Sequence, residues 1–239
     1  MNEDGSMARL PQLEVFAEKH GLKIITIEDL ACYRRQRESI VSRVESAKLP
    51  LDGGMYQTIA YRDHKGLEHL ALCYGPDATE NVLVRLHSEC LTGDVFGSLR
   101  CDCSQQLQLA MERIREQGSG ILLYLRQEGR GIGLANKIKA YALQDRGLDT
   151  VEANRELGFP DDARTYDVGA AILKELGIRS VRLMTNNPNK VSELEACGLK
   201  VSERLAHHGQ SNEANHGYLK TKAHKLGHLL PPDSEKPGK

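Results

Sequence analysis

Apolar positions between about residue 55 and residue 205 follow two alternating spacings. Short apolar or alternating runs are typical of strands, and apolar residues three or four apart are typical of helices. Each predicted helix ends at a glycine, which readily adopts the left-handed conformation found after a helix C-terminus. The predicted strands are 57–63, 68–75, 81–88, 120–127 and 179–187, and the predicted helices are 105–118, 134–147, 168–177 and 190–198.

This alternation predicts an α/β fold, with a mixed β-sheet and flanking helices. Residues 1–48 are polar and mostly helical in pattern, so we expect a short helical N-terminal extension. The segment 231–239 is short and rich in proline and charge, which predicts a disordered tail. The main domain is therefore predicted to span residues 49–230.

Charge and composition limit the classes of binding partner that this chain is expected to have. The chain has 32 Lys and Arg against 33 Asp and Glu, so it has no overall attraction for nucleic acid or an anionic membrane. Its longest apolar run, 121–125, is far shorter than the about 18 residues of a membrane span, and its N-terminus lacks the apolar core of a signal peptide. We expect an intracellular protein without a nucleic-acid or membrane partner, whose basic cluster at 34–37 is a solvated helix face.

Three of the six cysteines, Cys90, Cys101 and Cys103, lie within fourteen positions. In a reducing compartment such clusters are more often metal ligands than disulfides. Cys101 and Cys103 project to one side of an extended chain, and Cys90 follows the predicted strand 81–88, so two segments can converge on one ion. Thiolates favour zinc, and three local ligands favour a catalytic zinc whose fourth position is left for water.

Two features leave the chemistry of this predicted site open. His87 lies three residues before Cys90 and would close a structural site as a fourth ligand. Three thiolates and a dication also sum to a negative charge, so bound water would need a neighbouring base. Glu89 is a candidate for this base, which would accept a proton from the bound water. The alternative is that Glu89 orients a metal ligand by a hydrogen bond. The remaining cysteines, which we assign to packing, are Cys32, Cys73 and Cys197.

A glycine-rich turn at 129–133 lies between a predicted strand and a predicted helix. Its G-x-G-x-G spacing departs from the dinucleotide fingerprint, and it lacks the P-loop lysine. Such glycines still allow backbone amides to approach an oxyanion, and Arg130 can bind phosphate bidentately. Thr185 and Lys190 follow another strand end. The pattern favours a polyphosphate between the two strand ends, with a plain tight turn as the alternative.

Six short motifs follow one another in the chain. They are R-x-H-S-E-C-L-T-G-D at 85–94, R-C-D-C at 100–103, R-Q-E-G-R at 126–130, D-T-V-E-A-N at 149–154, D-x-R at 162–164 and T-N-N-P at 185–188. With the Y-L-x-T-K-x-x-K-x-G-H-L-L segment at 218–230, they resemble GTP cyclohydrolase II from about residue 50 onward. That family takes GTP as substrate, opens its imidazole ring and releases formate and pyrophosphate. The resemblance implies the first step of riboflavin biosynthesis and a homodimer.

The resemblance also implies ligands and cofactors. Cys90, Cys101 and Cys103 match the family's zinc ligands, one zinc per chain, and Mg²⁺ would accompany the GTP phosphates. The positions that match the family's GTP contacts are Arg85, Leu86, His87, Ser88, Glu89, Gln106, Glu128, Gly129, Arg130, Thr150, Thr185 and Lys190.

Three further residues receive catalytic roles from the resemblance. Asp162 matches the family's proposed proton acceptor, and Tyr141 matches a residue thought to assist ring opening. Arg164 matches a proposed nucleophile toward the α-phosphate. A guanidinium stays protonated in proteins, so we hold an equal alternative, in which Arg164 clamps phosphate charge in the transition state.

The N-terminal region resembles a different enzyme. N-E-D-G-S-M-A-R-L-P at 2–11 and F-A-x-x-H-G-L-K at 16–23 are similar to the C-terminal end of 3,4-dihydroxy-2-butanone 4-phosphate synthase, which is often fused upstream of the cyclohydrolase. Residues 1–48 are thus interpreted as a synthase remnant and linker, and we expect no synthase activity from this chain. The chain is alternatively part of a longer bifunctional protein. We expect a cytoplasmic protein, with a plastid as the alternative for a chain cut from a longer precursor.

Two other functions stay open. One is a nucleotide-binding module whose zinc is purely structural and which does not turn over GTP. The other is a nucleobase deaminase, but the chain lacks the H-x-E and P-C-x-x-C arrangement of that class. His224 and His228 have the helical spacing of a zinc pair, but no Glu follows His224, so we predict a packing or surface role.

Overall fold

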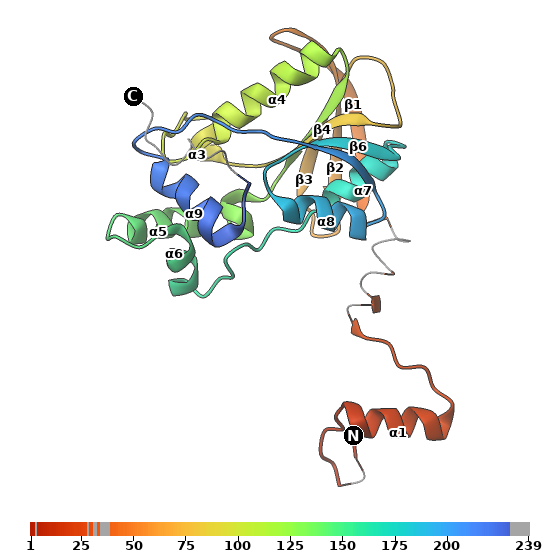
Figure 1. Ribbon diagram of the computed structural model, residues 1–239. Coiled ribbons are helices and arrows are strands. Elements are labelled where there is room, and N and C mark those ends of the chain that lie inside the picture. Colours follow the sequence, from red (N-terminus) through yellow and green to blue (C-terminus); the bar gives the residue numbers. More distant parts are fainter. Residues whose placement is uncertain (3, 28, 31–32, 34–38, 230–239) are drawn as a thin grey trace. The chain divides into compact units, whose positions relative to one another are not determined.

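The computed structural model describes residues 1–2, 4–27, 29–30, 33 and 39–229 (Figure 1). The chain divides into two compact units, Met1–Glu38 and Ser39–Lys239. The predicted tail, the basic cluster and Cys32 lie outside the described residues.

A mixed sheet forms the centre of the second unit, with strand order β1-β2-β3-β5-β4-β6-β7. Strands β1, β2, β3 and β5 pair antiparallel in turn, whereas β5, β4, β6 and β7 pair parallel. The prediction of a mixed α/β sheet is confirmed. The strands are β1 (Val41–Leu51), β2 (Gly54–Asp63), β3 (Glu68–Tyr74), β4 (Val82–Ser88), β5 (Gly120–Leu125), β6 (Ser180–Met184) and β7 (Lys200–Leu205).

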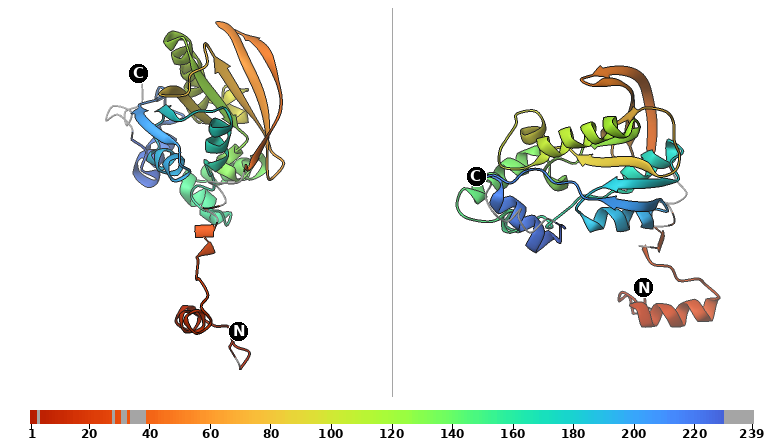
Figure 2. Two further views of the ribbon diagram at one scale, coloured as in Figure 1. Left: turned by 90° about the vertical axis from the view of Figure 1, so that its right-hand side faces the viewer. Right: turned by 45° about the horizontal axis from the view of Figure 1, so that its top comes forward.

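Helices cover both faces of this sheet (Figure 2). Leu83 of β4 packs with Ile114 of α4 on one face, and its neighbour Val84 packs with Ile172 of α7 and Leu194 of α8 on the other. Successive strand residues alternate between faces, so β4 contributes to both cores. The helical elements are α3 (Leu91–Asp94), α4 (Cys103–Gln117), η1 (Glu128–Gly131), α5 (Leu134–Gln144), α6 (Thr150–Glu156), α7 (Asp167–Glu175), α8 (Pro188–Ala196) and α9 (His216–Leu226).

The carboxyl ends of the parallel strands carry the predicted functional segments. Cys90 follows β4, the turn η1 follows β5, and Thr185 follows β6. Because β4 pairs in parallel with both β5 and β6, these three chain segments leave the sheet on the same side, at the carboxyl ends of the strands. Ligand sites of parallel α/β sheets lie at this edge.

Residues 41–48 correct one prediction. They form most of β1, whereas their polar pattern was interpreted as helical. The strand lies at the edge of the sheet, pairs only with β2 and is exposed along most of its length. A strand with two solvated faces does not show the alternation that identifies strands in a sequence. Strand β7 and helix α6 were also not predicted as elements.

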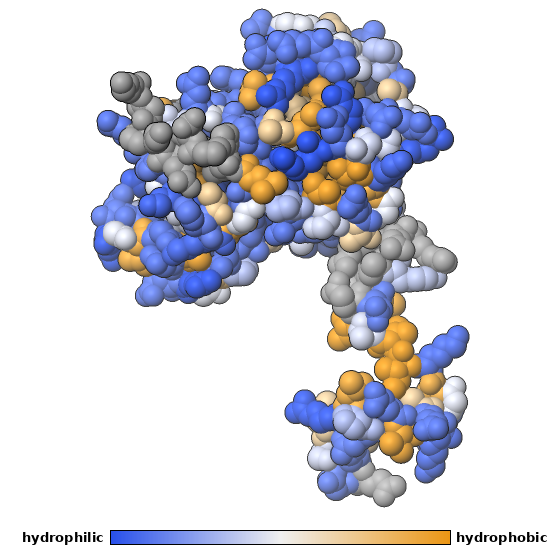
Figure 3. Space-filling model, viewed as in Figure 1, coloured by the Kyte–Doolittle hydropathy of each residue, from blue (hydrophilic) through white to orange (hydrophobic). Residues whose placement is uncertain are grey.

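The first unit contains α1 (Leu10–His20), which confirms the helical N-terminal extension. The helix ends at Gly21, whose φ of 62° is left-handed. After it, the chain exposes apolar side chains at Leu22, Ile24, Ile25 and Ile27, and apolar surface is visible on this unit in Figure 3.

We predict that Gly169→Ala destabilises the second unit by about 1–3 kcal/mol, because a methyl group there overpacks the core. An ideal Cβ at Gly169 of α7 would lie 2.3 Å from Cδ2 of Leu86. Urea denaturation measures the change. Gly217→Ala on α9 is the control, since its Cβ would meet nothing within 4 Å. Equal stability of the two variants would contradict close packing of α7 on β4.

Candidate metal centre and substrate cavities

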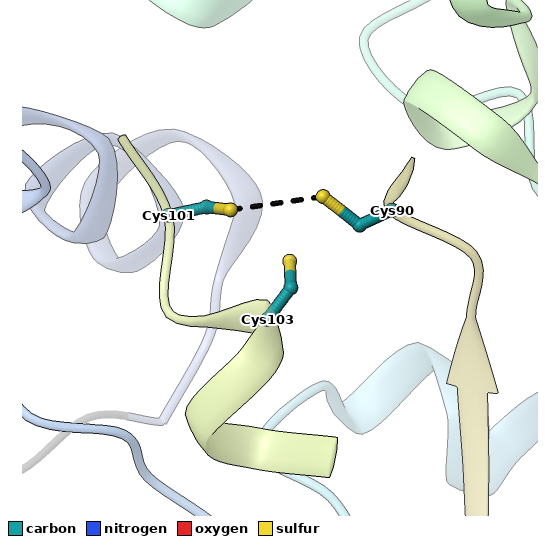
Figure 4. A group of neighbouring side chains, drawn as sticks. All are labelled: Cys90, Cys101 and Cys103. Atoms are coloured by element: carbon teal, nitrogen blue, oxygen red, sulfur yellow. Dashed lines mark hydrogen bonds between the residues drawn. The ribbon is translucent and has the colours of Figure 1, made fainter. Parts of the chain in front are cut away.

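Three cysteine sulfurs converge beside the end of β4 (Figure 4). Cys90 follows that strand, and Cys101 and Cys103 lie at the start of α4. The three Sγ atoms lie within 4.8 Å of one another, and 3.6 Å separates those of Cys90 and Cys101. Among the described residues, no histidine or carboxylate joins this group. The cluster therefore offers three ligand atoms from two chain segments, as the cysteine spacing predicted.

The cluster fits a metal ion. Hydrogen bonds from the Cys101 and Cys103 thiols hold the pKa of Cys90 far below its ordinary value, and the same contacts raise the pKa of Cys103. Binding of a metal ion would replace the protons of this hydrogen-bonded group. Gly93 gives them room, because a Cβ there would lie 2.9 Å from Sγ of Cys101 and 3.1 Å from Sγ of Cys90. The three-cysteine cluster can bind a metal.

His87 is held away from the sulfurs by Asp94. Its Nε2 lies 3.0 Å from both carboxylate oxygens, and its ring stacks on Tyr124 with 5.5 Å between the centroids. Asp94 also accepts hydrogen bonds from the Tyr124 hydroxyl at 2.8 Å and from the Cys90 amide at 3.0 Å. The carboxylate thus shapes the turn that presents Cys90, and His87 is not among the three-sulfur group.

Lys137 contacts the cluster from α5, and sequence reasoning missed it. Its Nζ lies 3.1 Å from Sγ of Cys90 and 2.7 Å from Oε1 of Glu128. The other Glu128 oxygen accepts from the Leu91 amide at 2.7 Å. Burial alone would lower the pKa of Lys137, but Glu128 and Cys90 raise it well above its ordinary value. The side chain is therefore a buried ammonium between a carboxylate and a sulfur of the three-cysteine cluster.

A first cavity, here called the thiol cavity, lies against the sulfurs. Both terminal nitrogens of Arg130 are buried and find no hydrogen-bond partner within the described part of the chain, and its guanidinium lies 5.4 Å from the Tyr218 ring centroid. Tyr141 places its hydroxyl 3.4 Å from Oγ1 of Thr92, and burial raises its pKa. The residues of the predicted site that line this cavity are Ser88, Glu89, Cys90, Cys101, Cys103, Glu128, Gly129, Arg130, Tyr141, Thr150 and Arg164.

A second cavity, here called the cationic cavity, shares Ser88, Cys103, Arg164 and Tyr218 with the first. Among the described residues that line it there is no Asp or Glu. Burial, together with the nearby charges of Arg85 and Arg164, lowers the pKa of Lys190 well below its ordinary value. Such an excess of positive charge favours an anionic ligand. The residues of the predicted site here are Arg85, His87, Ser88, Cys103, Gln106, Arg164, Thr185 and Lys190.

A buried polar chain joins the cationic cavity to the cysteine segment. Arg85 donates to Oε1 of Gln106, whose amide nitrogen donates to Asp102 at 2.5 Å. Asp102 also accepts from Lys222 of α9 at 3.0 Å. Burial would raise the pKa of Asp102, but Lys222 and Gln106 lower it to about 2. Asp102 is therefore a fixed anion that lies, in the sequence, between two cysteines of the cluster.

Asp162 and Arg164 form a bidentate pair. Nε of Arg164 lies 2.9 Å from Oδ1 of Asp162, and Nη2 lies 2.5 Å from Oδ2. Burial opposes both charges, but Tyr166 and Asp162 raise the pKa of Arg164, and Arg164 lowers the pKa of Asp162. Arg164 lines both cavities, whereas Asp162 lines neither.

Several other residues lie apart from their predicted places. Leu86 lines neither cavity; its side chain is in the core, and its carbonyl accepts from Nζ of Lys190 at 2.8 Å. His228 lines the cationic cavity, where burial lowers its pKa to about 3. Cys197 is in the core and Cys73 packs against it, in agreement with a packing role. Residues that sequence reasoning missed are Asp102, Lys137, Asn154, Tyr218 and Lys222.

The fold and the site define an α/β protein with a three-cysteine cluster, able to bind a metal, beside a cationic cavity. The sequence model of GTP cyclohydrolase II matches residues 42–206, and this chain belongs to that family. The model of 3,4-dihydroxy-2-butanone 4-phosphate synthase matches residues 1–33. The predicted synthase segment is thereby confirmed, with one correction. The match places it at the N-terminus of this chain and gives no support to calling it the C-terminal end of the synthase.

Relatives extend over nearly the whole chain. Riboflavin biosynthesis protein RibBA of Bacillus mycoides (strain KBAB4) is 55% identical over 232 residues, which cover 96% of this chain and 58% of that protein. RibBA of Bacillus subtilis (strain 168) is 54% identical over 233 residues, with the same coverage. This chain thus spans 58% of the length of these relatives.

A more distant likeness is found among solved structures. RibBX, described as a two-domain 3,4-dihydroxy-2-butanone 4-phosphate synthase from A. baumannii, is 28% identical with a TM-score of 0.45. The alignment covers 86% of this chain and 52% of that one.

Within the described part of the chain, no helix has the length and apolar character needed to cross a membrane.

We predict that Gly93→Ala weakens metal binding by about 10–100-fold, the usual effect of disturbing the residues around a metal site. The added methyl group would push the Cys90 and Cys101 sulfurs apart. Competition with a chromophoric chelator measures the affinity, with Gly217→Ala as the control. Metal binding as tight as in the unchanged protein would show that the sulfurs do not need this close approach.

Proposed function

We propose that this chain is a zinc-dependent GTP cyclohydrolase II. In this reaction GTP is hydrolysed to formate, pyrophosphate and 2,5-diamino-6-(5-phosphoribosylamino)pyrimidin-4(3H)-one, the first step of riboflavin biosynthesis. The main support is the shared wall between the thiol cavity and the cationic cavity. A nucleotide that spans both would bring its purine ring to the sulfurs and its phosphates to the cations.

Zinc is the ion proposed for Cys90, Cys101 and Cys103, because thiolates favour it and three protein ligands leave a position for water. When bound, zinc supplies an acidified water and a Lewis acid for attack on carbon 8 of the purine. Magnesium is proposed to arrive with the triphosphate, since the described residues hold no carboxylate cluster that would bind it independently.

The chain's own residues are proposed to act on the two ends of GTP. Arg85, Lys190 and Arg164 stabilise the triphosphate, and neutral Tyr141 donates a hydrogen bond to the opening ring. Asp162 fixes the guanidinium plane of Arg164 and can accept a proton once phosphate draws Arg164 away. Because Asp162 keeps Arg164 protonated, we propose a phosphate clamp rather than a covalent nucleophile.

The wider setting is also proposed. The relatives reported above are bacterial and named for riboflavin biosynthesis. We propose a cytoplasmic homodimer, which acts within or beside a bifunctional riboflavin protein. The alternative of a plastid protein gains no support from these relatives.

The central experiment incubates zinc-loaded protein with GTP and Mg²⁺ and measures formate, pyrophosphate and the pyrimidine product. We expect all three, their loss after zinc chelation, and their return when zinc is restored. Absence of formate from zinc-loaded protein would contradict the proposal. Bound GTP without products would indicate a structural zinc module, and ammonia without formate would indicate a deaminase.

We predict that Arg164→Lys lowers kcat by about 10²-fold or more, because a point charge cannot replace a planar clamp in the transition state. Arg155→Lys is the matched control, since Arg155 forms an exposed bidentate pair with Asp161. GTP labelled at its α-phosphate should leave no label on denatured unchanged protein. A stoichiometric covalent label during turnover would contradict the clamp and support the nucleophile.

A further inference from the structure

Lys137 is the one described lysine whose ammonium contacts a cysteine of the cluster. It projects from α5 and is 8% exposed. Two of its three N–H groups have defined acceptors, Sγ of Cys90 at 3.1 Å and Oε1 of Glu128 at 2.7 Å. Its position is therefore set by both contacts together, and solvent has little access to it.

Glu128 is itself held firmly, so it can act as an anchor for this lysine. Oε1 accepts from the Gly129 amide at 2.8 Å, and Oε2 accepts from the Leu91 amide at 2.7 Å. Leu91 directly follows Cys90 in the chain. The carboxylate thus ties the turn after β5 to the turn after β4 and directs the ammonium toward the sulfur of Cys90.

A hydrogen bond from a cation changes what a thiolate gives to a metal. The donor stabilises the sulfur electrons and so reduces their donation to the ion, which leaves the ion more electrophilic. Three thiolates and a dication sum to one negative charge, and the Lys137–Glu128 ion pair is itself neutral, so the summed charge of the site does not change. The ammonium acts locally at the Cys90 sulfur, where it limits donation from the thiolate that it contacts.

We propose that Lys137 is a positioning residue that acts on the metal through Cys90. In the loaded protein its ammonium hydrogen-bonds the Cys90 thiolate, limits sulfur donation and raises the electrophilicity of the metal. The spectroscopic consequence concerns the metal alone, whereas the consequence for GTP turnover rests on the proposed function. Glu128 holds the ammonium in place, which links the metal to a predicted substrate contact.

Cobalt(II) replaces zinc for the test, because its thiolate charge-transfer absorption reports sulfur donation directly. We expect Lys137→Met to bind one cobalt per chain and to shift this band to longer wavelength, since unprotected sulfur electrons lie higher in energy. Lys139→Met is the matched control, because Lys139 lies on the exposed side of the same helix. Its band should match that of the unchanged protein.

Turnover provides the second measurement. In the zinc form, Lys137→Met should lower kcat by about 10–100-fold with little change in KM for GTP, as expected when a group beside a metal ligand is lost. Lys137→Arg keeps the charge and a donor, and it should restore part of kcat and most of the band position.

An unshifted band in cobalt-loaded Lys137→Met would overturn the proposal. If that variant does not fold or bind cobalt, Lys137→Gln decides the question, because it keeps a neutral donor and should give a smaller shift in the same direction. An unshifted band there would also overturn it. The spectra are recorded without GTP, so a failure of GTP turnover alone would contradict the proposed function and leave this result intact.

Discussion

Burial of several cations at one edge of the sheet is the constraint on which the site depends. Arg85, Lys190 and Lys222 are each less than a tenth exposed, and unpaired charges in such positions cost several kcal/mol. The protein meets part of this cost with the carbonyls of Leu86 and Met184 and with the carboxylate of Asp102. The remaining positive charge is left for a ligand. An anion would therefore complete the fold of this region as well as occupy it.

The same polar contacts hold the metal centre in register with the cationic cavity. Asp102 stands between Cys101 and Cys103 in the sequence and reaches Arg85 through Gln106. On the other side, Glu128 reaches the Cys90 turn through a backbone amide. A shift of either end of the site would therefore disturb buried hydrogen bonds of the other.

Sequence patterns predicted what is local and missed what depends on tertiary contacts. Buried strands such as β4, helix ends at Gly118 or Gly198, and the cysteine spacing carry short-range signals, and all appear in the fold. Strand β1 was not predicted because a solvated edge strand does not alternate apolar and polar residues. The contacts of Lys137 and Lys222 could not be predicted because their partners lie 47 and 120 positions away, although Lys222 lies within a motif of the family resemblance. The family resemblance supplied the roles proposed for Asp162 and Tyr141, which no spacing rule could assign.

Strand β5 separates an antiparallel half of the sheet from a parallel half, and the two halves contribute differently to the site. The three clustered cysteines and the lining of both cavities come from the parallel half and the segments after it, whereas β1, β2 and the turn at 52–53 contribute none of them. The antiparallel half therefore offers an attachment point away from both cavities. A fluorophore or tether attached at the 52–53 turn would report on the molecule, or fix it to a surface, without occupying the thiol cavity or the cationic cavity.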